Sequence, residues 1–273
     1  MEGAGRTRRS AGRRTYGRSA AVGVAVLAIL TACGRGEAAK DSRAGDTAAS
    51  GAAGATPAGG ASSRAAPLRV VFVGTSLTAG LGLDPDSAYP ALLQRRADSA
   101  GVPVTMVNAG VSGETSAGAL RRIDWVLREP LDVLVLETGA NDGLRALEVD
   151  STRANLEAIL GRTRAAYPNA RLVLVQMEAP PNFGADYARR FRGMYPAAAR
   201  AAGATLAPFL LDRVAGVGAL NQPDGVHPNE RGERIVADNV WRALRPVLDS
   251  ARAGPVAASA GGAGPADVAA PAP

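Results

Sequence analysis

Val70-Val71-Phe72-Val73-Gly74-Thr75-Ser76-Leu77-Thr78-Ala79-Gly80 joins a run of apolar residues to a glycine-flanked turn. The first four residues are mostly β-branched, as is typical of a strand buried on both faces of a parallel sheet. Ser76 follows at the tip of the turn, and open α/β sheets bind ligands at this end of their strands. The stretch alone is equally compatible with an ordinary strand–turn–helix in which Ser76 caps the helix.

Apolar runs alternate with helical patterns over residues 68–250, which we take as the folded domain. This alternation predicts a parallel sheet with helices on both faces, joined by right-handed crossovers. We predict a three-layer α/β/α, flavodoxin-like fold with five strands in the order 2-1-3-4-5. The predicted strands are Leu68–Val73, Val104–Asn108, Leu131–Glu137, Arg171–Gln176 and Ala204–Pro208, and the predicted helices lie near Tyr89–Ala100, Ser116–Arg128, Ser151–Tyr167, Tyr187–Ala202 and Glu230–Asp249.

The N-terminal residues 1–32 have the pattern of a secretory signal, since an arginine-rich region precedes the short apolar run Ala20–Ala32. The run ends in Leu30-Thr31-Ala32-Cys33, which resembles the lipobox of bacterial lipoproteins. That resemblance implies a lipid on Cys33 and a membrane-anchored protein on the periplasmic or extracellular side of the cell envelope. The alternative is a plain signal peptide in which Cys33 occurs by chance.

Two further segments are poor in large apolar residues. Residues 33–67 are rich in alanine, glycine and serine, and residues 251–273 are rich in alanine, glycine and proline. Because such segments cannot bury a core, we expect a flexible tether and a disordered tail. We expect the domain between them to be a monomer.

Composition excludes several classes of function. The formal charge is +6, but residues 1–32 contribute six arginines and one glutamate, so the remainder of the chain is nearly neutral. No basic stripe with interleaved aromatic residues occurs there, which argues against a nucleic-acid partner. The chain has one cysteine and one histidine, which excludes the usual zinc ligand sets. We therefore expect no metal and no cofactor.

The single histidine, His227, lies three residues after Asp224 in the segment Asp224-Gly225-Val226-His227-Pro228. Gly225 and Pro228 favour a turn that brings the carboxylate beside the imidazole. An imidazole held in this way leaves one ring nitrogen free to take a proton from a serine hydroxyl, which is a poor nucleophile otherwise. We therefore predict a catalytic triad of Ser76, Asp224 and His227.

Two other predicted strand ends carry groups suited to an oxyanion. Gly113, after the second strand, can present an unobstructed backbone N–H group, and Asn141, after the third, has a side-chain amide between Gly139 and Gly143. Donors aimed at developing negative charge are what acyl transfer needs. A turn glycine and a loop cap are the simpler explanations for each residue alone. Their joint position at neighbouring strand ends favours an oxyanion hole that also uses the Ser76 amide.

These four loops resemble the four blocks of the SGNH (GDSL-like) hydrolase superfamily, and most closely its bacterial periplasmic thioesterase/lysophospholipase/arylesterase branch. The resemblance covers nearly all of residues 68–250. Gly74-Thr75-Ser76-Leu77 stands at the nucleophile block, Gly113 and Asn141 at the oxyanion positions, and Asp224 and His227 at the Asp-x-x-His pair. It implies a flavodoxin-like serine esterase that hydrolyses ester or thioester bonds without a metal.

One departure from the family pattern is Thr75, since the family usually has aspartate before the nucleophile. We expect Thr75 to satisfy nearby backbone N–H groups less well than a carboxylate would. Leu144, Pro181 and Phe183 lie in the loops expected to border the acyl group, although Phe183 packed on the core is an equal alternative. A carbohydrate O-acetylesterase of the same fold, or a lipid- or glycan-binding lipoprotein without activity, remain as alternative functions. A nucleotide-binding loop at Gly74–Gly82 is disfavoured because its spacing matches no phosphate-binding motif.

Overall fold

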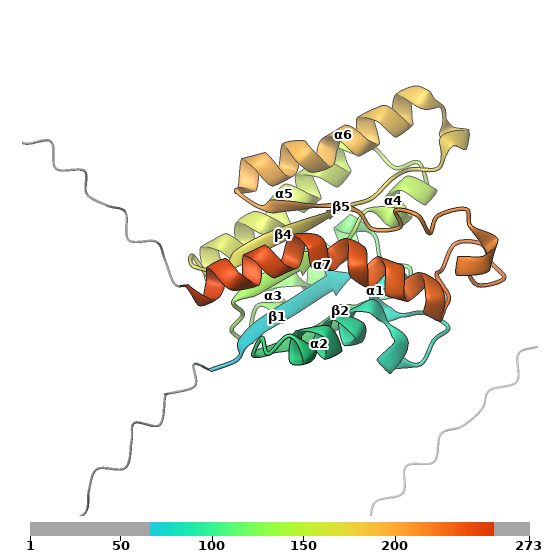
Figure 1. Cartoon of the computed structure of the whole chain (residues 1–273). Coiled ribbons are helices and arrows are strands. Elements are labelled where there is room, and N and C mark those ends of the chain that lie inside the picture. The colour runs from blue at the N-terminus through green and yellow to red at the C-terminus, as the bar shows by residue number, and fades with distance from the viewer. Residues whose placement is uncertain (1–65, 254–273) are drawn as a thin grey trace, which may run out of the picture. The chain divides into compact units, whose positions relative to one another are not determined.

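A parallel sheet forms the centre of residues 66–253, the part of the chain that the computed structural model describes (Figure 1). Its strands lie in the order β2-β1-β3-β4-β5, and each neighbouring pair is parallel. The predicted sheet and strand order are therefore confirmed. The strands are β1 (Leu68–Gly74), β2 (Val104–Gly110), β3 (Val133–Leu136), β4 (Arg171–Gln176) and β5 (Thr205–Phe209).

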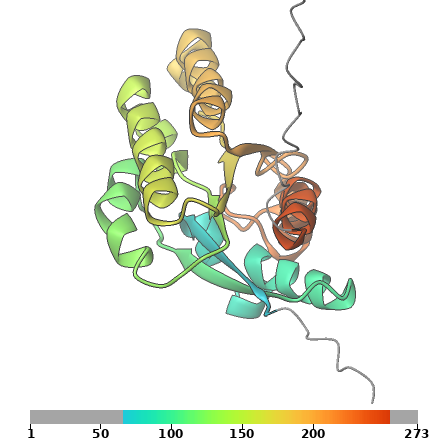
Figure 2. The same cartoon turned by 90° about the vertical axis from the view of Figure 1, so that its left-hand side faces the viewer.

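Helices cover both faces of this sheet and complete the predicted three layers. Helices α2 and α7 lie on one face, and α3, α5 and α6 lie on the other, as Figure 2 shows. The helices are α1 (Ser76–Ala79), α2 (Tyr89–Ser99), α3 (Ser116–Val126), α4 (Ala140–Leu144), α5 (Val149–Ala166), α6 (Ala185–Ala202) and α7 (Glu230–Arg252), and the 3₁₀ turns are η1 (Pro85–Ser87), η2 (Pro181–Phe183) and η3 (Gly218–Leu220).

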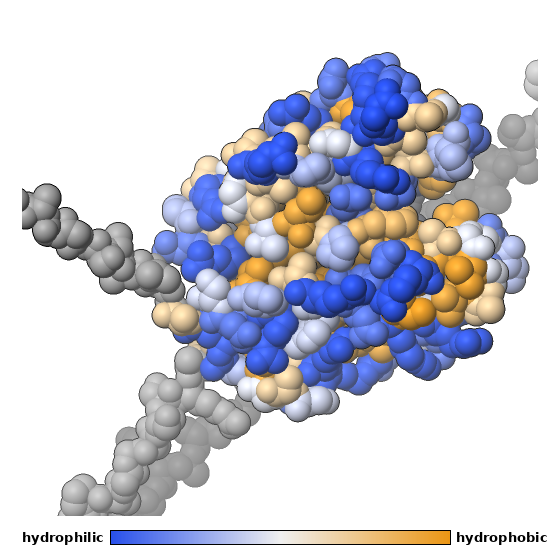
Figure 3. Space-filling view, turned by 45° about the horizontal axis from the view of Figure 1, so that its top comes forward, coloured by the Kyte–Doolittle hydropathy of each residue, from blue (hydrophilic) through white to orange (hydrophobic). Residues whose placement is uncertain are grey.

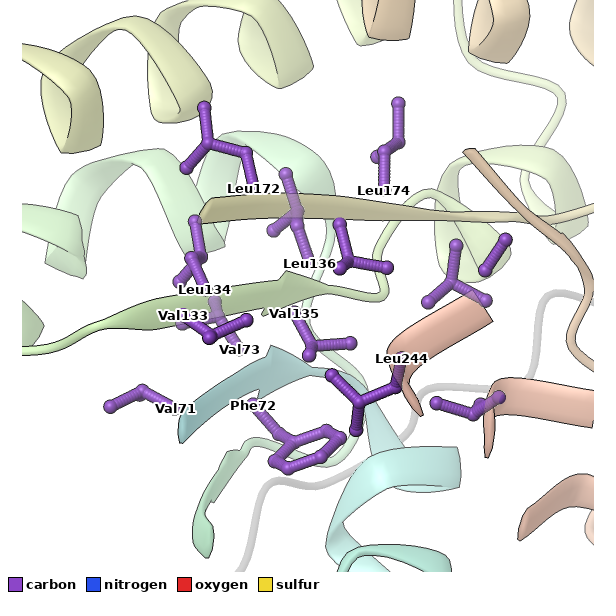
Figure 4. Packing of buried hydrophobic residues seen from close by; sticks show 14 of the residues in the cluster. Val71, Phe72, Val73, Val133, Leu134, Val135, Leu136, Leu172, Leu174 and Leu244 are labelled. Carbon is purple, nitrogen blue, oxygen red and sulfur yellow. The ribbon is translucent and has the colours of Figure 1, made fainter. Parts of the chain in front are cut away.

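The core lies where the central strands meet the helices of each layer (Figure 4). Residues 70–73 of β1 are at most 2% exposed, and all four residues of β3 are fully buried. A strand buried on both faces reads as a continuous apolar run, which explains why these two strands were clear from the sequence. Edge strand β5 contains Pro208, which lacks an N–H group and is tolerated at the edge of a sheet.

Most element bounds differ from the sequence-based expectation by one to three residues, and β3, for example, is Val133–Leu136 and not Leu131–Glu137. Helices α1 and α4 were not predicted, because four or five residues are too few to show a helical period. Helix α7 runs to Arg252, beyond the predicted domain end at residue 250, and stops before Gly254 and Pro255. Its last residues continue the helix because alanine and arginine favour it.

The predictions for residues 1–65 and 254–273, including the lipid attachment at Cys33, lie outside the described residues. The boundaries of the signal, tether and tail therefore stay predictions. Within residues 66–253, every helix is too short or too polar to cross a bilayer.

Candidate active site

Ser76 begins helix α1 directly after strand β1, at the carboxyl edge of the sheet. Its neighbour Thr75 is the N-cap, and Gly80 ends the helix with a left-handed φ of 72°. The Thr75 hydroxyl accepts from the Leu77 N–H group at 3.4 Å. Ser76 is 9% exposed, so it sits in a tight turn with little solvent around it. The local sequence thus produces a short, capped turn that presents one serine.

His227 and Asp224 complete a relay with Ser76. The His227 Nε2 atom lies 2.9 Å from Ser76 Oγ, and His227 Nδ1 lies 2.7 Å from Asp224 Oδ2. Asp224 Oδ1 also accepts from the backbone N–H groups of Val226 and His227 at 2.9 and 3.0 Å. The bonds from the His227 backbone and ring, then from Val226, lower the pKa of Asp224 to about 2. Asp224 is therefore ionised at neutral pH and suited to orient the imidazole.

Gln222 joins the histidine loop to the serine turn. Its Nε2 atom donates to Leu81 O at 2.7 Å and to Pro228 O at 2.9 Å. Gly82 makes this approach possible, since a Cβ atom there would lie 2.3 Å from Gln222 Oε1. Sequence reasoning missed Gln222, and the only signal for it was its place two residues before Asp224.

Gly113 lies in the loop after β2, and Asn141 lies at the start of α4, in the segment after β3 that we call the Asn141 loop. Gly113 has a φ of 77°, and a Cβ atom there would have open space around it. The Asn141 Nδ2 atom donates to Glu114 O at 3.0 Å, which links the two loops. The Val111 N–H group donates to Gly74 O at 2.9 Å, which links the Gly113 loop to strand β1. The arrangement leaves the second Asn141 N–H without a partner among the described residues.

Asp142, beside Asn141, is a residue whose role sequence reasoning missed. It is 2% exposed and accepts from Ser116 N at 2.8 Å and from Ser116 Oγ at 2.6 Å. Ser116 is the first residue of α3, directly after the Gly113 loop. Asp142 therefore fixes the Asn141 loop to the start of the helix that follows Gly113.

The residues predicted to border the acyl group are on the same edge of the sheet. Leu144 is 46% exposed and Phe183 is 39% exposed, so Phe183 is not packed into the core. Pro181 and Phe183 form the 3₁₀ turn η2, and the Phe183 ring packs edge-on against Tyr187 at 6.0 Å. Figure 3 shows hydrophobic residues gathered at the right-hand end of the molecule, where the strands end. Exposed apolar side chains at a site favour an apolar ligand.

Thr75 does more in the structure than the sequence suggested. Besides capping Leu77, its hydroxyl and its backbone N–H group both donate to the carboxyl group of Glu137. Glu137 follows strand β3 and is fully buried. Burial raises its pKa to about 7, and the hydrogen bonds from Thr75 and Thr78 oppose that rise. Sequence reasoning placed Glu137 at the end of a strand and gave it no role.

The chemistry that these groups can perform is acyl transfer. A neutral imidazole within hydrogen-bond distance of a hydroxyl can take its proton, and an ionised carboxylate on the other ring nitrogen stabilises the imidazolium. Within residues 66–253, no cluster of three or more histidine, cysteine, aspartate or glutamate side chains is placed to hold a metal ion.

Comparison with known proteins gives the same assignment. Residues 72–235 match the model of the GDSL-like Lipase/Acylhydrolase family. Esterase TesA of Pseudomonas aeruginosa is 38% identical over 188 residues, which are 68% of this chain and 92% of that protein. Thioesterase 1/protease 1/lysophospholipase L1 of Escherichia coli strain K12 is 35% identical over 187 residues, 68% of this chain and 87% of that one.

A solved structure agrees with these relatives. The crystal structure of AlinE4, an SGNH-hydrolase family esterase, superposes with a TM-score of 0.56 at 38% identity and covers 67% of this chain and 97% of that one. The resemblance stated from the four loops is thereby confirmed. This chain belongs to the GDSL-like lipase/acylhydrolase family and is a serine esterase of the SGNH type.

Proposed function

We propose that the protein hydrolyses esters or thioesters of single acyl chains through an acyl-enzyme on Ser76. The observation that carries the proposal is the relay of two short contacts, 2.9 Å from Ser76 Oγ to His227 Nε2 and 2.7 Å from His227 Nδ1 to Asp224 Oδ2. A binding protein without activity has no need of this alignment, so the intact relay argues against that alternative.

In the proposed reaction His227 takes the hydroxyl proton while Ser76 Oγ attacks the acyl carbonyl carbon. The backbone N–H groups of Ser76 and Gly113 and the side-chain amide of Asn141 bind the oxyanion of the tetrahedral intermediate. The imidazolium then gives its proton to the leaving oxygen or sulfur, and the acyl group stays on Ser76. Water repeats the sequence on the acyl-enzyme and releases the carboxylic acid.

The substrate class follows from the apolar residues near the relay and from the relatives. Leu144, Pro181 and Phe183 border the acyl chain in this proposal, and the first and third of them are well exposed. The relatives are named as an esterase and as a thioesterase and lysophospholipase. An acyl chain longer than acetyl would cover these apolar side chains. The acetyl group of an acetylated carbohydrate would be too short to cover them.

We also propose that the chain is exported and anchored to a membrane of the cell envelope through a lipid on Cys33. Support comes from the arginine-rich and apolar residues 1–32 and from the single cysteine that follows them. The proposal predicts that the protein incorporates labelled palmitate in a bacterial host and that Cys33→Ala does not. Equal labelling of both proteins would contradict it.

The test of the activity is a series of p-nitrophenyl esters and acyl thioesters of increasing chain length. We expect the wild type to turn them over with an optimum beyond acetyl, and Ser76→Ala to lose turnover by about 10⁴-fold or more. Ser99→Ala is the matched control, since the Ser99 hydroxyl bonds only Arg95 O at the end of α2. Turnover by Ser76→Ala equal to the wild type would refute the mechanism, and an acetyl optimum would favour the acetylesterase.

A further inference from the structure

A buried carboxyl group lies directly beneath the serine turn. Glu137 is fully buried, and its Oε2 atom accepts from Thr75 N at 2.9 Å and from Thr78 Oγ1 at 2.7 Å. The Thr75 hydroxyl lies 3.1 Å from both of its oxygens. Because Thr75 and Thr78 stand on either side of Ser76 in the sequence, one carboxyl group holds both flanks of the nucleophile.

Gly74 leaves the space that this carboxyl group occupies. A Cβ atom at Gly74 would lie 2.0 Å from Thr78 Oγ1 and 2.7 Å from Glu137 Oε2. Atoms at these separations overlap, so any larger residue would displace the threonine or the carboxyl group. The glycine that ends strand β1 therefore serves the contact between Glu137 and the turn.

The same cluster continues to the helix that follows His227. Thr78 Oγ1 lies 2.8 Å from the hydroxyl oxygen of Tyr89, and the Tyr89 N–H group donates to Glu233 Oε2 at 2.8 Å. Glu233 is 1% exposed and belongs to the first turn of α7, which begins three residues after His227. Hydrogen bonds thus run from β3 through the serine turn and α2 to the helix behind the histidine.

The groups around Glu137 are backbone N–H, hydroxyl and carboxyl groups. Glu137 accepts hydrogen bonds directly from Thr75 and Thr78, and Tyr89 is linked to it through the Thr78 hydroxyl. Its charge also interacts with Tyr195 and Glu233. Burial raises the pKa of Glu137 to about 7, and burial followed by the neighbouring Glu137 charge raises the pKa of Glu233 to about 8. Burying two carboxyl groups without a cation is costly, which argues for a use that offsets the cost.

We infer that Glu137 is a positioning residue for Ser76, acting through Thr75 and Thr78 to hold Ser76 Oγ at its 2.9 Å distance from His227 Nε2. This inference rests on the proposed role of Ser76 as nucleophile. Thr75 suits the arrangement because its hydroxyl donates to the carboxyl group, whereas an aspartate there would set a second carboxylate against the first. The nucleophile oxygen must stay close to its reactive position relative to the base. A shift of this oxygen by about 1 Å costs on the order of 10²-fold in rate.

The test compares Thr78→Val, Thr78→Ser and Glu137→Gln with the wild type. We expect Thr78→Val to lower kcat about 10- to 100-fold with KM within about twofold, and Thr78→Ser to recover most of the loss because it restores the hydroxyl. Thr163→Val is the matched control, since Thr163 is also fully buried but its hydroxyl donates only to Ile159 O within α5. The control should keep the wild-type kcat.

Two measurements separate positioning from loss of folded protein. The first is the rate at which an alkyl phosphonate inactivates each variant, because it reports the reactivity of Ser76 per folded molecule. The second is the double variant Glu137→Gln/Thr78→Val, whose loss of rate should be smaller than the two single losses combined, since both changes disturb the same contact between Thr78 and Glu137. Wild-type inactivation rates in Thr78→Val, a Thr78→Ser variant as slow as Thr78→Val, or fully additive effects would overturn the inference.

If Glu137→Gln fails to fold, two comparisons still test whether Glu137 positions Ser76. One compares Thr78→Val with Thr78→Ser, and the other compares Thr75→Val with Thr75→Ser. Thr75→Val removes the hydroxyl bonded to Glu137, and Thr75→Ser keeps it. Failure of the positioning role is distinct from failure of the proposed function. In the first case the threonine variants behave like the wild type while Ser76→Ala is inactive, and in the second Ser76→Ala retains activity.

Discussion

Replacing Glu233 by glutamine should make the stability of the protein less dependent on pH. Glu233 is 1% exposed, accepts a hydrogen bond from Tyr89 N at 2.8 Å, and has a pKa raised from 4.5 to about 8, mainly by burial. Glutamine keeps an acceptor oxygen at this position but cannot ionise. The matched control is Glu230→Gln, which changes an exposed carboxylate in the same first turn of α7.

The sign of the effect follows from proton binding. Between pH 4.5 and about 8 the folded protein keeps a proton on Glu233 that the unfolded chain has released. Its contribution to stability is therefore complete below pH 4.5 and is lost as the pH rises to about 8. The free energy of unfolding falls by about 1.4 kcal/mol per pH unit across this window, or about 3 kcal/mol from about pH 5.5 to 8.

Urea unfolding from pH 5.5 to 8.5 measures this difference. We expect the curve of free energy against pH for Glu233→Gln to be flatter than that of the wild type by roughly 1.4 kcal/mol per unit up to about pH 8. The two curves should run parallel above that pH, and Glu230→Gln should follow the wild type throughout. Parallel curves for the wild type and Glu233→Gln over the whole range would refute the argument.

Two further variants probe the Asn141 loop. Asn141→Ala should lower kcat for a p-nitrophenyl ester by about 10²- to 10³-fold with a smaller change in KM, since it removes a donor that stabilises mainly the transition state; an equal rise in KM with constant kcat would contradict the oxyanion role. Gly139→Ala should lower the free energy of unfolding by about 2 kcal/mol or more, because Gly139 has a φ of 102° and its Cβ would lie 2.3 Å from the Tyr195 hydroxyl oxygen. Gly161→Ala, in open space within α5, should instead be neutral or stabilising, and urea unfolding of both variants at one pH measures the difference.

The sheet and the relay were predictable because their sequence signals are local. Val70–Val73 and Val133–Leu136 are continuous apolar runs of strand length. Such a run is typical of a strand that is buried on both faces of a parallel sheet. Asp224 and His227 lie three residues apart around a glycine, so a turn was enough to pair them. Ser76 became the predicted nucleophile only together with Asp224 and His227, since its place at the end of a strand fits an ordinary helix cap equally well.

The buried carboxyl groups were not predictable, because their partners are distant in sequence. Glu233 pairs with Tyr89, 144 residues away, and Glu137 with Thr75, 62 residues away. A glutamate in the first turn of a helix is usually a solvated residue that complements the helix dipole, so Glu233 looked ordinary. In the fold α7 packs against α2, and Glu233 is 1% exposed.

Hydrogen bonds join the loops of the site to one another. The Gly113 loop joins the serine turn through Val111 N–H and Gly74 O at 2.9 Å, and the Asn141 loop joins it through Glu137. The histidine loop joins the serine turn through Gln222 and Leu81 O at 2.7 Å.

Every loop that carries a proposed reacting group therefore has a hydrogen bond to the turn of Ser76, and three of these bonds end on backbone atoms of the turn, at Gly74 O, Thr75 N and Leu81 O. Backbone partners survive changes of side chain, which explains how the family aspartate is replaced here by Thr75 while the contacts of Ser76 with His227 and of His227 with Asp224 stay at 2.9 and 2.7 Å. Backbone bonds cannot take the place of a side chain that binds residues on both sides of Ser76, at Thr75 and at Thr78. In this chain that side chain is Glu137.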